Sequence, residues 1–250
     1  MNSLPLVALH GWGMTPKVWN PQRICLSPMR FDTLTLPGHD GRPPAGAGLD
    51  AWVEQLATDL QQPCVLAAWS LGAMLALELA RRYPSRVRRL ILFGSTPSFV
   101  NRMVSAERPA WTHGLDMQTM NGFIDSFNAD PGATLQRFVH LQTLGGSERR
   151  GIVHTLNRAL DRPEKRNLAA LADGLHLLRD IDLRARVDQV TQPTLLIHGE
   201  QDALMPCDAA HWLQQHMPDA RLERFPACGH APFIANPEAC AALIRHELAA

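Results

Sequence analysis

The 250-residue sequence has no surplus of charge of either sign, because its 24 lysines and arginines match its 24 aspartates and glutamates. General binding to nucleic acids needs a basic surface, so this balance argues against that class of protein. No apolar run approaches the length of about 18 residues that a transmembrane helix requires. The first residues combine no basic segment with a long apolar one. We therefore expect no signal peptide, no membrane span and a cytoplasmic location.

Cysteine is scarce as well, and no two cysteines have the C-x-x-C spacing. A scattered, odd-numbered set is typical of reduced thiols and suits neither a disulfide framework nor a zinc site. Internal repeats, low-complexity tracts and phosphate-binding loops are also missing. Hydrophobic residues make up 46% of the chain, which is typical of a globular protein with one large core. The five cysteines are Cys25, Cys64, Cys207, Cys228 and Cys240.

The most informative stretch is a short apolar run, residues 64–69, followed by residues 71–82, which are rich in Ala, Leu and Met. The first pattern is typical of a buried strand and the second of a helix. Ser70 lies at the junction, and the small residues Ala68 and Gly72 allow the backbone to turn sharply there. This is the G-x-S-x-G nucleophile turn with Ala68 in place of the first glycine. The alternative is a serine that caps an ordinary helix.

Strands and helices alternate along most of the chain, which predicts a parallel sheet with right-handed crossovers. The run from residue 98 to residue 182 has helical segments and no convincing strand, and an insertion of that length is usually functional. We predict an α/β fold with a mostly parallel central sheet flanked by helices. Residues 1–97 and 183–250 form its core, and residues 98–182 form a helical lid insertion. The expected strands are 4–9, 31–36, 64–69, 87–93, 194–198 and 221–225, and the expected core helices are 15–25, 49–60, 71–82, 208–216 and 237–248.

Three residues that follow predicted strands have the chemistry of a catalytic triad. Substrates of a parallel α/β sheet bind at the carboxyl ends of its strands. A serine hydroxyl needs a base to become a nucleophile, and the base needs an orienting acid. Ser70, Asp202 and His230 occur in the chain order of the α/β-hydrolase triad. Among the 11 histidines, His230 is favoured because it alone follows the last predicted strand, while Glu200 is an alternative acid.

The first predicted strand ends in a loop, His10-Gly11-Trp12-Gly13. Two glycines around a bulky residue allow an unusual backbone, so the N–H of Trp12 can point into a cavity. The N–H of Leu71, directly after the proposed nucleophile, supplies the second donor of an oxyanion hole. The alternative is a simple glycine turn.

Together these features resemble the α/β-hydrolase superfamily over essentially the whole chain. A closer resemblance is to the esterase family that hydrolyses the methyl ester of pimeloyl-[acyl-carrier protein] in biotin synthesis. It implies a serine carboxylesterase without metal or cofactor, in which Trp12, Leu71 and His230 contact the reacting ester. The first glycine is replaced by Ala68, and we expect the usual leading hairpin to be missing. The segments that carry the closer resemblance are 9–13, 69–72, 137–145 and 229–233.

The predicted lid has a candidate pocket face and a candidate docking face. Phe138, Leu141 and Gln142 have the spacing of one helix face. As a pocket roof, the two apolar residues suit an acyl chain and Gln142 offers a polar contact; alternatively, the apolar pair belongs to the lid core. Nearby arginines predict transient docking of an acidic acyl-carrier protein and its phosphopantetheine phosphate on a monomer, with a merely solvated face as the alternative. These arginines are Arg137, Arg149, Arg150 and Arg158.

The predicted reaction is a two-step acyl transfer through an acyl-enzyme. His230 takes the proton of Ser70, protonates the departing methanol and then activates water, while Asp202 orients the imidazole. Alternatives with the same fold are a general short-chain carboxylesterase, a lactonase and a carbon–carbon bond hydrolase. A ligand-binding relative without catalysis is a further alternative, against which the three triad residues argue.

Overall fold

The chain folds around a single sheet of parallel strands. The computed structural model describes residues 4–106, 108–147, 149–162 and 165–249. Within these residues the sheet has six strands in the order β2-β1-β3-β4-β5-β6, and each neighbouring pair is parallel. The predicted parallel sheet is therefore confirmed, with small differences at strand ends. The strands are β1 (Leu6–Leu9), β2 (Phe31–Leu34), β3 (Cys64–Trp69), β4 (Val87–Phe93), β5 (Thr194–Gly199) and β6 (Ala220–Phe225).

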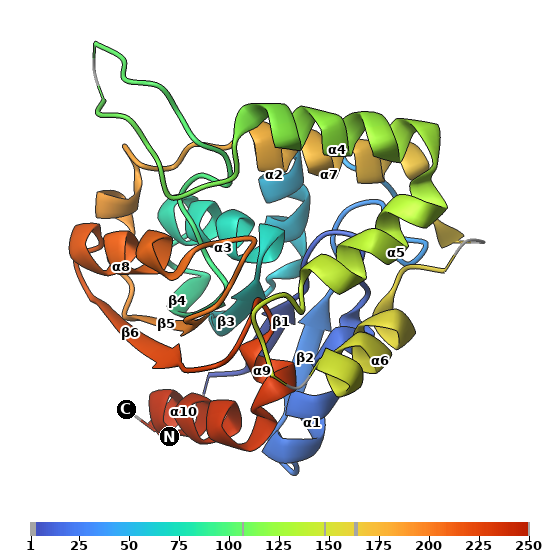
Figure 1. Cartoon of the computed structure of the whole chain (residues 1–250). Coiled ribbons are helices and arrows are strands. Elements are labelled where there is room, and N and C mark those ends of the chain that lie inside the picture. The colour runs from blue at the N-terminus through green and yellow to red at the C-terminus, as the bar shows by residue number, and fades with distance from the viewer. Residues whose placement is uncertain (1–3, 107, 148, 163–164, 250) are drawn as a thin grey trace.

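Helices cover both faces of the sheet, which explains why the inner strands β1 and β3 are continuous apolar runs. Every residue of β1, β3 and β5 is buried, whereas the edge strand β6 is only partly buried. Figure 1 shows α1 and α10 on one side of the sheet and α2, α3 and α8 on the other. The core helices are α1 (Asn20–Leu26), α2 (Leu49–Asp59), α3 (Leu71–Arg82), α8 (Cys207–His216), α9 (Pro232–Ala235) and α10 (Pro237–Ala249), with a short 3-10 helix η1 (Pro16–Trp19) before α1.

The segment between β4 and β5 is helical. Side chains at its helix starts accept backbone N–H groups as caps: Asp116 at α4, Asp130 at α5 and Asn167 at α7. In the described part of residues 98–182 no strand forms, in keeping with the helical character expected there. Its helices are α4 (Met117–Ala129), α5 (Pro131–Leu141), α6 (Arg149–Ala159) and α7 (Leu168–Asp180).

The helical segment is hydrogen-bonded to the loop that follows β1. The N–H of Thr15 donates to the carbonyl of Ala159 at 2.8 Å, and the N–H of Asp161 donates to the carbonyl of Gly13 at 3.1 Å. In Figure 1 the helices α4, α5 and α7 extend across the sheet on the side where β1 and β3 end. The last residue of α6 and the segment that follows it therefore contact the loop after β1.

The structure adds three observations to the sequence expectations. Among the described helices, none combines the length and the apolar character needed to cross a bilayer. In the same part of the chain, no three or more His, Cys, Asp or Glu side chains come together as ligands for a metal ion. The five cysteines are free thiols.

Candidate active site

Ser70 occupies the sharp turn between β3 and α3. Its backbone has φ 59° and ψ −124°, a conformation that a non-glycine residue adopts only when its surroundings enforce it. The surroundings are tight, since a Cβ at Gly72 would clash with the backbone of His10 and a Cβ at Gly11 would lie 3.0 Å from the Cβ of Ser70. Ser70 directly precedes α3, and its hydroxyl accepts no backbone N–H from this helix, all of which the structure describes. The side chain is therefore not an ordinary helix cap.

Asp202, in the loop after β5, and His230, in the loop after β6, form a buried pair. The Nδ1 of His230 donates to the Oδ2 of Asp202 at 2.7 Å. The other carboxylate oxygen accepts the N–H groups of Leu204 and Met205, each at 2.9 Å. Burial opposes the charge of Asp202, but His230, His198 and their hydrogen bonds hold the pKa of its carboxyl below the ordinary value. A charged carboxylate selects the His230 tautomer with its proton on Nδ1.

The surroundings of Asp202 separate the two candidate acids. Glu200 is exposed on the surface, with its Oε1 3.7 Å from the Nη1 of Arg224. His198, to which sequence analysis assigned no role, has its Nε2 2.7 Å from the carbonyl of Met205 and 3.4 Å from the Oδ2 of Asp202. The sequence feature that could have identified His198 is its position as a polar residue near the end of the mostly apolar strand β5. The carboxylate of Asp202 therefore faces two histidines.

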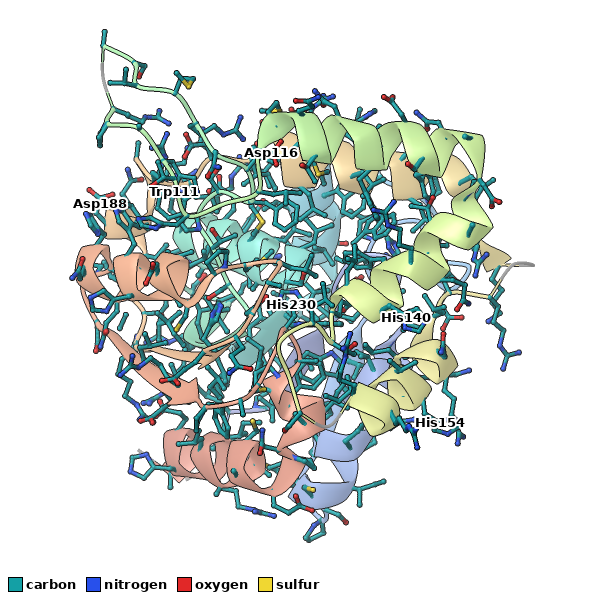
Figure 2. The ribbon with its side chains drawn as sticks, in the orientation of Figure 1. Trp111, Asp116, His140, His154, Asp188 and His230 are labelled. Carbon is teal, nitrogen blue, oxygen red and sulfur yellow. The ribbon has the colours of Figure 1, made fainter. Side chains whose placement is uncertain are left out.

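The second ring nitrogen of His230, Nε2, is free of hydrogen bonds within the described residues. Within the described residues, His230 Nε2 is buried without a hydrogen-bond partner, and Ser70 Oγ makes no bond to it. The N–H of Ser70 donates to the carbonyl of Phe93 at 3.1 Å, and a Cβ at Gly94 would lie 2.8 Å from the His230 ring. Figure 2 shows His230 near the centre of the molecule, between the sheet and α5. Catalytic hydrogen bonds often form only when substrate binds, so the missing bond does not count against Ser70 and His230 as a catalytic pair.

Two buried histidines hold the loop that contains Trp12. The Nε2 of His10 accepts a backbone N–H from the chain after β2, and the Nε2 of His39 accepts the N–H of Gly13, each at 3.1 Å. Burial is the largest cause that lowers the pKa of His10 to about 3 and the pKa of His39 to about 4, so both rings are neutral acceptors. The backbone N–H groups of Trp12 and Leu71 donate to no described residue. They are therefore available to an oxyanion. Neither histidine is among the residues predicted for the site, although each stands beside a glycine.

An apolar cavity of about 420 Å³ lies between the helical segment and the loop after β5. Phe138 and Leu141, both predicted contacts of the acyl chain, are in its wall. Trp12 supports this wall: its ring packs edge-on against Phe138 with the centroids 5.1 Å apart, and its indole N–H donates to the carbonyl of Leu171 at 2.7 Å. The residues that line the cavity are Phe99, Leu115, Thr119, Met120, Gly122, Phe123, Arg137, Phe138, Leu141, Leu144, Leu175, Leu178, Ala203 and Leu204. Ser70, Leu71 and His230 are not among these described lining residues.

Gln142, the predicted polar contact with substrate, is buried next to the candidate base. It is 1% exposed and lies outside the described cavity wall, and its Nε2 donates to the carbonyl of Phe138 at 3.4 Å. Because Gln142 is the C-cap of α5, its own carbonyl is not used by the helix. That carbonyl accepts the N–H of His230 at 3.3 Å. Gln142 thus contacts the candidate base through its backbone.

The arginines of the predicted docking face are exposed but lie in separate places. Arg137 is part of the cavity wall. Arg158 lines a different groove, of about 710 Å³, together with His154. Arg149 and Arg150 are exposed at the start of α6, and Figure 2 shows His154 on the outer side of the same helix. The basic residues are therefore spread over α5 and α6.

Comparisons with known proteins identify the family of this chain. The sequence profile of the alpha/beta hydrolase family matches residues 6–243. The chain is 51% identical over 245 residues to the pimeloyl-[acyl-carrier protein] methyl ester esterase of Aromatoleum aromaticum, with 98% of each chain covered. It is 40% identical over 239 residues to the protein of the same name from Nitrosomonas europaea, with 95% of this chain and 92% of the relative covered.

Solved structures support the fold. An esterase from Exiguobacterium antarcticum superposes with a TM-score of 0.86 at 21% identity, covering 100% of this chain and 93% of the other. An enol-lactonase from Burkholderia xenovorans superposes with a TM-score of 0.81 at 17% identity, covering 100% of this chain and 93% of the other. At these identities the likeness concerns the fold alone, and the predicted fold class is confirmed.

Proposed function

Because this chain belongs to the alpha/beta hydrolase family, we propose that it is a serine carboxylesterase that hydrolyses the methyl ester of pimeloyl-[acyl-carrier protein]. The products are pimeloyl-[acyl-carrier protein] and methanol, in the course of biotin synthesis. The names of its curated relatives support the substrate. The observation that supports the chemistry best is the buried pair of His230 and Asp202 at 2.7 Å, beside a serine in a strained turn.

The proposed mechanism follows from the tautomer of His230 that the bond to Asp202 selects. Its Nε2 has a free lone pair and accepts the proton of Ser70 as Oγ attacks the ester carbonyl. The N–H groups of Trp12 and Leu71 donate to the oxyanion of the tetrahedral intermediate. His230 then protonates the departing methanol, and in the second step it activates the water that hydrolyses the acyl-enzyme. Asp202 holds the tautomer and stabilises the imidazolium, and the scheme uses no metal or cofactor.

The helical segment, residues 98–182, serves as a lid in this proposal. Its cavity of about 420 Å³ has a volume typical of small-molecule sites. Phe138 and Leu141 in its wall suit the methylene chain of a pimeloyl group, because burial of apolar carbon is favourable.

The proposal includes transient docking of the acidic carrier protein on the basic residues of α5 and α6. Arg137 lies where an apolar cavity meets the surface, and Arg149, Arg150 and Arg158 are exposed on α6. Positive charge on these helices would steer an acidic partner toward the lid. The enzyme acts as a monomer in the cytoplasm under this proposal.

Hydrolysis of pimeloyl-[acyl-carrier protein] methyl ester and of a short p-nitrophenyl ester tests the function. The wild type should hydrolyse both and prefer the carrier-bound ester strongly. Ser70→Ala should lower kcat by about 10⁴-fold or more without preventing folding. Full turnover by this variant would refute Ser70 as the nucleophile. Hydrolysis of the short ester alone would indicate a general carboxylesterase in place of the biotin role.

A further inference from the structure

The side chain of Trp69 connects the candidate nucleophile to the candidate base. Trp69 is the last residue of β3 and directly precedes Ser70. Its indole Nε1–H donates to the backbone carbonyl of His230 at 2.8 Å, across 161 residues of sequence. The two rings lie with their centroids 5.5 Å apart. A hydrogen bond from the neighbour of the nucleophile therefore reaches the residue that must take its proton.

The bond from Trp69 is one of three hydrogen bonds that hold His230. Its ring is held by Asp202 at 2.7 Å, and its N–H donates to the carbonyl of Gln142 at 3.3 Å. Within the described residues, Trp69 is the only donor to the His230 carbonyl. His230 is 1% exposed, so water cannot readily replace this donor. Of the three contacts, only the one from Trp69 comes from β3, the strand that Ser70 directly follows.

We propose that Trp69 is a positioning residue, whose indole N–H sets the distance between Ser70 Oγ and His230 Nε2. This inference rests on the proposed esterase function and adds a residue to it. Trp69 and Ser70 share a peptide bond, so movement of the His230 loop away from β3 must break the indole bond. A displacement of about 1 Å between reacting groups can lower the rate about a hundredfold. A single hydrogen bond at this point can therefore affect the chemical step.

A second tryptophan offers a matched control. Trp19 is buried like Trp69, and both rings pack against Phe233, with centroids 4.4 Å and 5.2 Å away respectively. The difference is in the indole nitrogen, because Trp19 Nε1 has no hydrogen-bond partner among the described residues. Replacing either tryptophan by Phe removes a similar buried volume next to Phe233. Only the change at Trp69 also removes a hydrogen bond to His230.

The experiment compares Trp69→Phe with Trp19→Phe in the full chain. We expect Trp69→Phe to lower kcat for a short p-nitrophenyl ester by about tenfold to a hundredfold, with KM within about twofold of wild type. Trp19→Phe should keep kcat within about threefold, even if both variants lower Tm equally. A residue with a merely structural role would lower Tm without this selective loss of kcat. Equal kcat in the two folded variants, or a loss confined to KM, would overturn the inference.

Two further measurements cover variants that fold poorly and keep the outcome separate from the proposed substrate. Benzothienylalanine at position 69 replaces the indole N–H by sulfur and preserves the ring, and it should reproduce the loss of kcat, whereas the same replacement at position 19 should not. The rate of reaction with a fluorophosphonate reports the reactivity of Ser70 without an acyl substrate. This rate should fall about tenfold or more in Trp69→Phe alone, and an unchanged rate would overturn the inference. Failure to hydrolyse the carrier-bound ester would instead count only against the proposed function.

Discussion

Replacement of Asp202 by Asn changes the proposed catalytic pair with almost no change of shape. The remaining carbonyl oxygen can still accept the N–H groups of Leu204 and Met205, so the loop keeps both of these bonds. The amide nitrogen would stand where Oδ2 now accepts the proton of His230 Nδ1 at 2.7 Å. The new amide N–H group and the Nδ1–H of His230 are both donors, so they cannot form a hydrogen bond with each other. His230 must then carry its proton on Nε2, and it can no longer accept one from Ser70.

We expect Asp202→Asn to lower kcat by about 10⁴-fold, which corresponds to about 5.5 kcal/mol of lost transition-state stabilisation. KM should change little, because Asp202 is outside the described cavity wall. The assay is steady-state hydrolysis of a p-nitrophenyl ester, with Tm measured on the same preparation to show that the variant is folded. A folded variant whose kcat stays within about tenfold of wild type would refute the role of Asp202.

Glu200→Gln is the matched control, because Glu200 is the alternative acid and lies two residues before Asp202. Glu200 is exposed, and its contact to Arg224 spans 3.7 Å. Loss of such a surface pair changes stability by about 1 kcal/mol at most. We expect kcat close to that of wild type. A large loss in Glu200→Gln together with an active Asp202→Asn would exchange the two roles.

Further predictions concern stability and docking. Acid should destabilise the fold through His10 and His39, because a pKa lowered from 6.5 to about 3 and about 4 means that the unfolded chain binds more protons below pH 6.5. Each histidine should reduce the free energy of unfolding by about 1.4 kcal/mol for each pH unit of acidification in that range. When this free energy is measured by urea unfolding at several pH values, it should fall less steeply with decreasing pH in His39→Gln than in the wild type. An equal dependence on pH would contradict the role of His39. Gly72→Ala should reduce the free energy of unfolding by about 1–3 kcal/mol because its Cβ meets the backbone of His10, whereas Gly151→Ala, in open space on α6, should increase it by up to about 1 kcal/mol. Similar effects of the two glycine variants in chemical denaturation would show that the close approach at Gly72 is not limiting. Arg158→Glu should raise KM for the carrier-bound ester, most at low salt, and leave KM for a p-nitrophenyl ester unchanged; a change that is independent of salt would place docking elsewhere.

Local sequence patterns were sufficient for the sheet. The apolar run at 64–69 predicted β3, because a strand covered on both faces must be apolar along its whole length. The predicted strand 87–93 is β4, although its second and third residues are arginines. The alternation of strands with helices predicted their parallel direction, because a crossover helix returns the chain to the same edge of the sheet. The helical character of the segment after β4 was visible for the same reason: each helix has its own repeating pattern of apolar residues.

Local sequence patterns could not predict the contacts around His230. Asp202 was expected beside it from chain order alone, but the bond from Trp69 and the bond to Gln142 join residues 161 and 88 positions away. Sequence spacing on α5 suggested that the side chain of Gln142 faces substrate. The spacing did not show that the position of Gln142 at the end of the helix frees its backbone carbonyl for His230. Helix periodicity identifies a face, whereas the end of a helix determines which backbone groups need partners.

The sequence by itself determined the parallel sheet, the helical segment between its fourth and fifth strands and the strand ends at which reactive residues occur. These features depend on apolar periodicity and turn residues, which act within a few residues of one another. Only the tertiary structure decided that Asp202 and not Glu200 meets His230, that Trp69 supports the base, and that Arg137 and Arg158 lie in different hollows. Each of these depends on how distant elements pack, and packing is set by the whole core at once.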